Sequence, residues 1–583
     1  MKSINHWPLT ILHSLIAITK LFLPLVLVRI FSLQEIGEYK LFWLYLVIVP
    51  EFFGTSALAG GLGYWGGQQR RLHYITAALV LGMVSSVLAP VLLVLYSTFF
   101  GPVFSSFYFE LAFLVNSAII IPRLLLEELL VVNGDVWRSA GYRVVGEVFR
   151  VVMLVLVVSQ TRDLGLALFV ASGGSAIELG CYVWRIIAKR SNSLSRASVS
   201  DFVKVFSYLV PVAFSGLAVI LFERFDQIFL SHVLTPEDFA LYAIGCLAIP
   251  PLFVLEQSVT RVLIPALAKS LTSTEKKSHA IILFRSSVAQ LAFFLVPSAI
   301  FISVFSHPIT IVLFTSRYER ASQFLSLYAL TYVFLVFPYD VFPRALGKSG
   351  WLFRFHLLAG CLSVLSVAIG GALNGPFGAL VGLCFSQASI RFLALSQAAQ
   401  ELRVSRSDLI PLFALLKISV SSLLAIVCSV PLFFTQLSSL TLVVAGGISF
   451  SIGFLVMWIL FPLKTSSRVL RDVPPTIIQL TQFLATGGLE RLVMNLAIRL
   501  NATQRWQCEV VSYDVLEHSN STELQNELEG KGVRVHQLMK KRRFSISTVL
   551  QLQHIIAREG VSILHTHDLG SLIYGSLAKC LSI

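Results

Sequence analysis

Long apolar stretches separated by short polar loops dominate residues 1–463. A helix needs about 20 mostly apolar residues to cross the hydrocarbon core of a bilayer, so each such stretch predicts a membrane-spanning helix. This criterion predicts fourteen spanning helices, at residues 9–31, 41–65, 74–100, 106–133, 143–160, 164–187, 205–231, 239–263, 281–305, 323–344, 355–373, 376–398, 410–434 and 440–463. The apolar run at 309–315 is too short to span and is predicted as a loop turn.

The pattern changes after residue 463. A basic, Pro-containing linker, KTSSRVLRDVPP (464–475), leads into short strand and helix signals over 476–583. Strands are predicted at 476–480, 508–513, 533–538 and 562–567, and helices at 488–501, 521–530, 546–559 and 570–581. Such alternation is typical of a parallel sheet with helices on its faces. The predicted fold is therefore mostly α, a polytopic membrane domain (1–463) followed by a small α/β Rossmann-like cytoplasmic domain (476–583).

Composition supports the membrane assignment. Hydrophobic residues make up 56% of the chain and charged residues 13%, with a mean hydropathy of +0.79, whereas soluble domains carry roughly a quarter charged residues. The seven cysteines are scattered and lack the CxxC or Cys/His spacing of a metal site. No metal site is therefore expected.

The loop charges predict the orientation. With the N-terminus inside, the alternating inner segments hold 22 Lys and Arg residues, whereas the outer loops hold only Lys40, Arg162, Arg317 and Arg320. Basic residues concentrate on the cytoplasmic side of membrane proteins, so both termini are predicted to be cytoplasmic. The net charge of +14 then reflects topology, and no nucleic-acid partner is expected because no basic domain or aromatic platform accompanies it.

The membrane domain contains an internal repeat. FSLQEIGEYK (31–40) resembles LTPEDFALYA (234–243) at an offset of 203 residues, and the landmarks NGD (133–135) and LG (164–165) correspond to LGK (346–348) and FG (377–378) at an offset of 213. The spans thus form two six-helix lobes plus two further helices. Two even-numbered lobes enter the membrane in the same direction, which predicts a substrate path between them.

These features resemble a known family. The chain resembles polysaccharide and O-antigen flippases of the multidrug/oligosaccharidyl-lipid/polysaccharide exporter superfamily. The resemblance rests on the 6+6+2 arrangement of helices, on the loop SLQEIGEYK with its repeat TPEDFALY, and on LGKSGWLFRFHLLAGCLSVLSVAIGGALNGPFGALVGL (346–383). The resemblance implies a bacterial inner-membrane protein that moves a polyprenyl-diphosphate-linked oligosaccharide outward during O-antigen or lipopolysaccharide assembly. It implies membrane lipids and other polysaccharide-assembly proteins, including a glycosyltransferase, as partners.

Such a substrate requires positive charge and hydrogen-bonding groups along the route of its diphosphate headgroup. Charged residues within the predicted spans are Lys20, Arg29, Glu51, Arg123, Glu127, Glu128, Glu147, Arg150, Glu178, Glu223, Arg224, Asp226, Glu256, Arg285, Arg391 and Lys417. Helical spacing favours a structural interpretation for two groups, Arg143 with Glu147 and Arg150, and Arg123 with Glu127, because partners at i,i+4 neutralise each other without a ligand.

The repeat selects the cavity candidates. At an offset of 203, Lys20 aligns with Glu223, and the family resemblance places the helices that carry them on the central cleft. The predicted cavity residues are Lys20, Arg29, Glu51, Glu223, Arg224 and Asp226. Lys20 and Glu223 either pair across the cleft in one state of the transporter, or each finds a partner or water within its own lobe.

The C-terminal segment carries a second resemblance. GGLERLVMNLAIRL, VVSYD and ILHTHDLGSLIYGSLAK resemble the N-terminal half of family 4 retaining glycosyltransferases with the GT-B plan. The resemblance implies that Gly487 and Gly488 lie near the donor diphosphate and His567 near the reacting groups, and glycines at a helix N-terminus suit phosphate. A nucleotide sugar at this domain is the only small-molecule cofactor suggested.

The second GT-B domain, with its paired-glutamate donor motif, does not follow before residue 583, and there is no DxD motif. Catalysis by this chain alone is therefore not expected. Either the chain is a shortened form of a flippase–transferase fusion, or the domain is a docking module that couples synthesis to export.

Two further functions stay open for the whole protein, a membrane-anchored glycosyltransferase and a drug or cation exporter of the same superfamily. Fourteen helices in repeated lobes exceed what an anchor needs, which favours transport.

Overall fold

The structure is a computed structural model that describes residues 22–67, 72–188, 196–271, 277–460, 476–485, 487–503, 506–514, 521–538, 540, 545–559 and 561–582. Its contacts divide the chain into two compact units, Met1–Lys464 and Thr465–Ile583. Each unit is described separately below.

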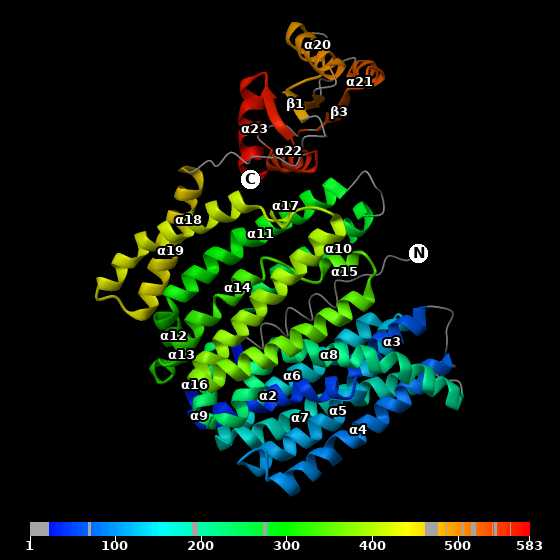
Figure 1. Cartoon of the computed structure of the whole chain (residues 1–583), viewed down its shortest axis with the longest axis vertical. Coiled ribbons are helices and arrows are strands. Elements are labelled where there is room, and N and C mark those ends of the chain that lie inside the picture. The colour runs from blue at the N-terminus through cyan, green and yellow to red at the C-terminus, as the bar shows by residue number, and fades with distance from the viewer. Residues whose placement is uncertain are drawn as a thin grey trace. The chain divides into compact units, whose positions relative to one another are not determined.

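The first unit is a helical bundle (Figure 1). Residues 22–30 are helical. The elements that follow are α2 (Leu33–Phe52), α3 (Thr55–Gly67), α4 (Leu72–Phe100), α5 (Phe107–Val132), α6 (Val136–Thr161), α7 (Leu164–Ala188), α8 (Val199–Val233), α9 (Pro236–Gly245), α10 (Pro250–Leu271), α11 (Lys277–Val304), α12 (Ser306–Phe314), the 3₁₀ turn η2 (Ser316–Tyr318), α13 (Ala321–Tyr328), α14 (Thr331–Phe334), α15 (Val341–Ala345), α16 (Ser349–Leu402), α17 (Arg406–Leu409), α18 (Leu412–Ser429), the 3₁₀ turn η3 (Val430–Phe434) and α19 (Ser439–Leu460).

Within the described residues, ten helices are long and apolar enough to cross a membrane, and the pair α2 and α3, bent by 49°, makes an eleventh if it is one span. α16 has 54 residues but breaks at Asn374 and at Gly375, whose φ is +53°. It therefore contains both of the spans predicted at 355–373 and 376–398. The predicted first span lies mostly outside the described residues.

The prediction of one helix over 323–344 was wrong, since this stretch forms the short helices α13, α14 and α15. Pro338 and Pro343 lie in it, and proline lacks the N–H that a helix interior requires. The predicted span 239–263 divides into α9 and α10, and Pro250 occupies the first position of α10, which proline favours. The N–H of Ile249, within the break between them, donates to the Tyr332 hydroxyl at 2.9 Å.

The apolar run at 309–315 is also helical, since it lies largely in α12 and not in a loop turn as predicted.

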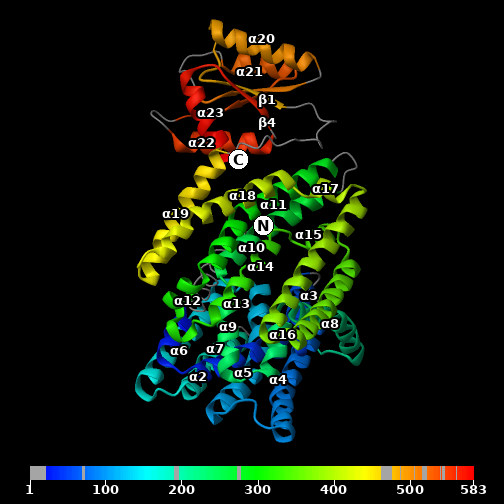
Figure 2. The ribbon, with the colours of Figure 1, turned by 60° about the vertical axis from the view of Figure 1, so that its left-hand side comes forward.

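Figures 1 and 2 show α2 to α7 as one bundle and α10 to α19 as a second. Between them, α8 packs against α16 and also against α2, α3 and α4.

The two repeat phrases take the same local structure. Ser32 caps α2, with its side chain accepting from the Glu35 N–H, and Thr235 caps α9 by accepting from the Asp238 N–H. α2 and α9 pack together, so closely that a Cβ on Gly37 would lie 1.9 Å from the Pro236 carbonyl oxygen. The two repeat phrases thus meet where α2 packs against α9, on the predicted outer side.

The second unit contains four parallel strands and four helices. The strands are β1 (Thr476–Thr481), β2 (Gln507–Ser512), β3 (Arg534–Gln537) and β4 (Val561–Thr566), in the order β3-β2-β1-β4. The helices are α20 (Gly488–Ala502), α21 (Ser521–Gly530), α22 (Ile546–Arg558) and α23 (Leu569–Ser582). All eight predicted elements are confirmed within a few residues, and so is the parallel sheet.

The sheet has a core on each face. One contains Val493, Ala497 and Leu528 from α20 and α21, and the other contains Leu552 and Tyr574 from α22 and α23. Strand order places β1 beside β4, so the loops after these two strands meet at one edge of the sheet. Gly487, Gly488 and His567 lie in these loops or directly after them.

Candidate functional site

Helix α8 carries three of the predicted cavity residues at the junction of the two bundles. Glu223 and Arg224 are exposed, whereas Asp226, less than one turn further on, is 1% exposed. Arg224 interacts electrostatically with both carboxylates, but only Asp226 is withdrawn from the surface.

Glu223 belongs to a charged cluster in the second bundle. It interacts electrostatically with Arg224 and with Arg391 on α16, and Glu256 on α10 interacts with Arg391 and Glu223. The carboxylates of Glu223 and Glu256 thus both interact electrostatically with the buried guanidinium of Arg391. Sequence analysis noted Glu256 and Arg391 as charges within spans but did not select them, because only the fold brings α8, α10 and α16 together.

Arg391 is the best-buried cation of this cluster, with 6% of its surface exposed. It donates to the Gln387 carbonyl at 3.1 Å and to the Gln387 Oε1 at 2.5 Å, and its Cζ lies 5.6 Å from the centre of the Tyr339 ring. Its Nε has no hydrogen-bond partner. A buried N–H without a hydrogen-bond partner is costly, so the Nε of Arg391 can still donate a hydrogen bond to a polar atom.

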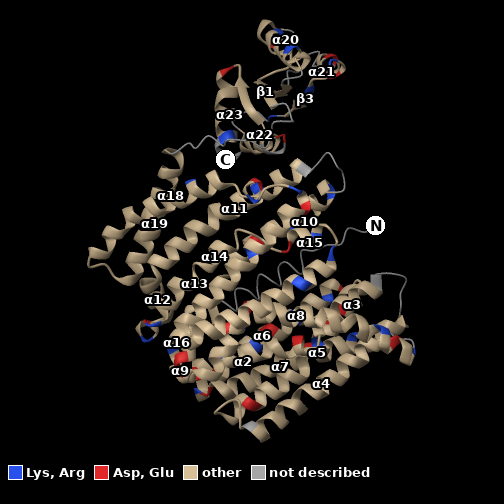
Figure 3. Ribbon diagram, in the orientation of Figure 1, with Lys and Arg blue, Asp and Glu red and all other residues tan. Residues whose placement is uncertain are grey.

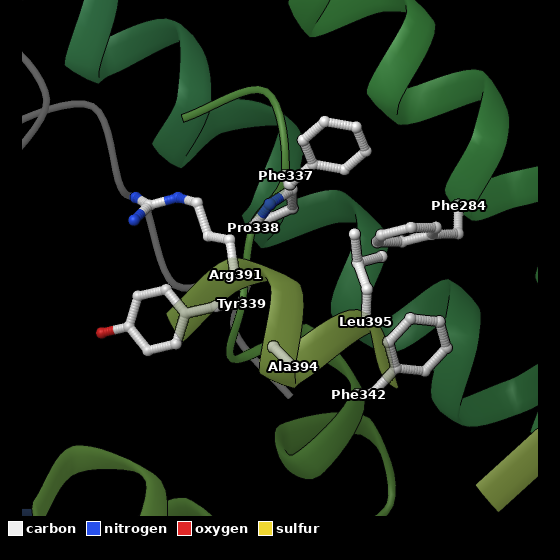
Figure 4. Close-up of a pocket in the computed structure, with 8 residues that line it drawn as sticks. All are labelled: Phe284, Phe337, Pro338, Tyr339, Phe342, Arg391, Ala394 and Leu395. Carbon is white, nitrogen blue, oxygen red and sulfur yellow. The ribbon is translucent and has the colours of Figure 1, made fainter. Parts of the chain in front are cut away.

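Figure 4 shows that the guanidinium of Arg391 and the hydroxyl of Tyr339 extend toward the same side, away from the aromatic rings of Phe284 and Phe342. These residues line a cavity of about 10 Å³, roughly the space of one water molecule. The arginine stem lies on the apolar side, and its charged end points away from these rings.

Asp226 is buried between α8 and α9. Its Oδ2 accepts from the Tyr242 hydroxyl at 2.5 Å, and its Oδ1 is buried without a partner. Tyr242 is the residue that the repeat aligns with Tyr39. The structure thus places Asp226 in the packing between helices, and its predicted role in a cavity stays a prediction.

Arg29 joins the two bundles. From the helical segment 22–30 its guanidinium donates to the carbonyls of Val312 and Leu313 at the end of α12, both at 3.1 Å. The last carbonyls of a helix have no partner within it. Arg29 therefore caps a helix of the opposite bundle.

Glu51 lies at the end of α2 and accepts a hydrogen bond from Ser56. A Cβ on Gly216 of α8 would lie 2.7 Å from the Glu51 Oε2. This carboxylate thus touches α8, the helix that carries Glu223. Lys20 lies outside the described residues, so its alignment with Glu223 stays a prediction.

Charged residues of both signs lie on α5, α6 and α7 (Figure 3). Arg123 pairs with Glu178 at 3.0 Å, Arg143 with Glu127 at 2.5 Å, and Arg150 with Glu147. These charges do pair within the protein, but the expected pairs of Arg123 with Glu127 and of Arg143 with Glu147 were wrong, since two of the three observed pairs connect different helices. Spacing along one helix could not identify these partners.

In the C-terminal unit, Gly487 is the N-cap of α20 and Gly488 its first residue. The Glu490 Oε2 would lie 2.2 Å from a Cβ on Gly487, so a carboxylate already lies against the glycine turn. An anion bound at this glycine turn would lie beside the negatively charged Glu490 carboxylate, and this repulsion weakens the preference of the helix N-terminus for phosphate. Phosphate binding at these glycines stays a prediction.

His567 follows β4 and is half-buried. Its Nε2 lies 2.7 Å from the Gln479 Oε1 on β1. Burial lowers the pKa of this histidine, the neighbouring His565 lowers it further, and Asp568 opposes them. The described residues contain no cluster of three or more His, Cys, Asp or Glu that could hold a metal ion.

Comparisons with known proteins agree with this architecture. Residues 138–323 match the family model described as "Polysaccharide biosynthesis protein", and residues 486–583 match "Glycosyltransferase Family 4". No curated protein matches the chain.

Two solved structures share the fold of the membrane unit. One is "Lipid II flippase MurJ, inward closed conformation", with a TM-score of 0.62 and 14% identity over 77% of this chain and 97% of that one. The other is an inward-facing multidrug resistance MATE family transporter of the MOP superfamily, with a TM-score of 0.52 and 13% identity over 65% of this chain and 93% of that one.

The chain is therefore a multi-pass membrane protein with the fold of the MOP superfamily. Residues 138–323 are similar to polysaccharide-biosynthesis proteins and residues 486–583 to glycosyltransferase family 4, so both resemblances drawn from the sequence are confirmed.

Proposed function

We propose that this protein moves a polyprenyl-diphosphate-linked oligosaccharide from the inner to the outer leaflet of a bacterial inner membrane, with both termini in the cytoplasm. One observation carries the proposal: the chain matches a polysaccharide-biosynthesis family model within a membrane unit that shares its fold with a lipid II flippase. The distribution of Lys and Arg among the loops supports the orientation.

The charged cluster on α8, α10 and α16 suits the headgroup of such a substrate. Arg391 offers an unpartnered guanidinium N–H to a phosphate oxygen, and Glu223, Glu256 and Gln387 offer acceptors to sugar hydroxyls. Lys20 adds a second cation if it lies opposite Glu223 as the repeat predicts. The lipid tail would stay in the bilayer.

A multidrug exporter is the second candidate, supported by the fold shared with a MATE transporter. Glu223 and Glu256 are the groups that would attract a cationic drug.

The family 4 segment also supports a membrane-anchored glycosyltransferase, or a module that brings the enzyme making the lipid-linked sugar to its exporter. A nucleotide sugar is the ligand proposed for that segment.

Transport by the full chain in proteoliposomes tests these alternatives. A fluorescent polyprenyl-diphosphate oligosaccharide should become accessible on the opposite leaflet, and Arg391→Met should slow this at least tenfold, because one charge-assisted contact contributes about 1.5–3 kcal/mol. Lys20→Ala should also reduce transport, and Lys20→Glu with Glu223→Lys should restore part of it.

Lys417→Met is the matched control. Lys417 also lies within a span, but its Nζ stacks 3.6 Å from the centre of the Trp458 ring, between α18 and α19. It should transport like the wild type at equal protein level. Wild-type transport by Arg391→Met would remove the cluster from the substrate path, and ethidium export without glycan transport would favour the multidrug exporter.

A further inference from the structure

The Phe222 carbonyl of α8 accepts hydrogen bonds from two side chains of α16. The Ser363 Oγ donates to it at 3.4 Å and the Gln387 Nε2 at 3.3 Å, from opposite sides of the break in α16. Phe222 is buried, with 2% of its surface exposed. A carbonyl oxygen has two lone pairs and can accept more than one hydrogen bond. The backbone of α8, one residue before Glu223, is thus bound to both halves of α16.

The side-chain amide of Gln387 uses both of its ends. Its Nε2 donates to the Phe222 carbonyl, and its Oε1 accepts from the Arg391 Nη1 at 2.5 Å. A guanidinium can only donate and a carbonyl can only accept, so these two partners permit one orientation of the amide. Gln387 therefore connects the backbone of α8 to the guanidinium of Arg391.

Aromatic rings connect the same two elements on the other face of Arg391. The Arg391 Cζ lies over the Tyr339 ring, and this ring meets the Phe222 ring edge to face, with 5.8 Å between their centres. Phe222, Gln387, Arg391 and Tyr339 therefore form a closed ring of contacts. They come from α8, from α16 and from the segment before α15.

This ring fixes one side of the guanidinium and leaves the other side free. Nη1 is bound to Gln387, whereas Nε has no hydrogen-bond partner. A strong hydrogen bond to a phosphate oxygen needs a donor at a defined distance and angle. Without Gln387, the guanidinium could turn toward Glu223 and Glu256, which interact with it electrostatically.

We infer that Gln387 is a positioning residue for the diphosphate headgroup: it holds the Nη1 of Arg391 against the backbone of α8, so that the Nε stays available to a phosphate oxygen. The inference deepens the proposed function and rests on it, because the diphosphate is the headgroup proposed above. Gln387 acts through Arg391, so its effect on the diphosphate depends on that arginine.

Binding of geranylgeranyl diphosphate to the full chain in nanodiscs tests the inference by isothermal titration calorimetry, with geranylgeraniol and empty nanodiscs as background. This probe carries no sugar, so it reports the diphosphate contact alone. Gln387→Met should weaken binding about threefold to tenfold, within the coupling range of residues in contact. In an Arg391→Met background, Gln387→Met should weaken it no further.

Gln387→Glu separates holding the arginine from leaving it free. Its carboxylate still accepts from Nη1, but it cannot donate to the Phe222 carbonyl, and its charge opposes the diphosphate. It should weaken binding at least as much as Gln387→Met.

Nuclear magnetic resonance of the ¹⁵N-arginine-labelled full chain shows whether the guanidinium is held. The signals of Arg391 are assigned by their loss in Arg391→Lys. The wild type and Gln387→Glu should show separate Nη signals, whereas rotation of the released guanidinium should average them in Gln387→Met.

Gln397→Met is the matched control. Gln397 is also half-buried on α16, and its side chain makes no hydrogen bond within the described residues. It should bind the diphosphate and show the Nη signals of the wild type.

Three results would overturn the inference: wild-type binding by Gln387→Met, unchanged Nη signals in Gln387→Met, or equal weakening by Gln387→Met with and without Arg391. No binding of the diphosphate by the wild type would refute the proposed headgroup itself, and the Nη signals would still show whether Gln387 holds Arg391.

Discussion

The contact between Arg29 and α12 predicts a barrier to opening of the predicted outer side. Arg29→Gln removes a guanidinium that donates to the carbonyls of Val312 and Leu313. The Tyr45 hydroxyl of α2 and the Ser231 Oγ of α8 also lie 2.9 Å apart. We expect α8 to move with α16, against which it packs, so opening on this side must break both contacts and loss of Arg29 should favour the open state.

The size of the effect follows from the geometry. A hydrogen bond from a charged group contributes about 1.5–3 kcal/mol when buried, but Arg29 is exposed, and exposed charge interactions contribute about 0.2–1 kcal/mol. A cation at a helix C-terminus adds about 0.3–1 kcal/mol. The expected total of about 0.5–2 kcal/mol corresponds to a roughly 2–30-fold shift in a two-state equilibrium.

Thiol labelling measures this shift. In a variant whose seven native cysteines are replaced by serine, Ser231→Cys reports opening, because it lies between α2 and α8. A membrane-impermeant maleimide added from outside should label this cysteine about 2–30 times faster when Arg29→Gln is present.

Arg162→Gln is the matched control. Arg162 follows α6, belongs to a predicted outer loop and is exposed, and its side chain makes no ion pair or hydrogen bond within the described residues. It should leave the labelling rate unchanged. Equal rates for Arg29→Gln and Arg162→Gln would refute the idea that Arg29 holds the bundles together.

Two further predictions concern packing and orientation. Gly37→Ala should lower the midpoint of thermal unfolding in detergent, because the added Cβ would lie 1.9 Å from a backbone carbonyl oxygen and overpacking costs about 1–3 kcal/mol. Gly60→Ala is the control, since Gly60 lies in a helix and faces open space. It should leave the midpoint unchanged or raise it. A cysteine at Ser195 should be labelled only from the cytoplasm and one within 234–238 only from outside; the reverse result would invert the topology.

The sequence by itself determined the architecture, because architecture depends on local patterns. Burial in a bilayer needs about 20 apolar residues in a row, and a parallel sheet needs strands that alternate with helices, so both units could be predicted. The repeat phrases at 31–40 and 234–243 were also visible. Composition alone did not show that 323–344 is broken, because the prolines lie within an otherwise apolar run.

Only the tertiary structure decided which polar groups meet. Arg123 pairs with Glu178, 55 positions away, and Arg29 reaches α12 across 283 and 284 positions. Charges in a low-dielectric environment must find partners, but sequence spacing identifies partners only within one helix.

The same limit applies to the C-terminal unit. A glutamine in an otherwise apolar strand was a visible signal that the sequence analysis did not use, and its partner, His567, lies 88 positions away. Pairing of β1 with β4 brings the two side chains together. Local periodicity determines which elements form, whereas contacts between distant elements determine which atoms remain free to bind a ligand.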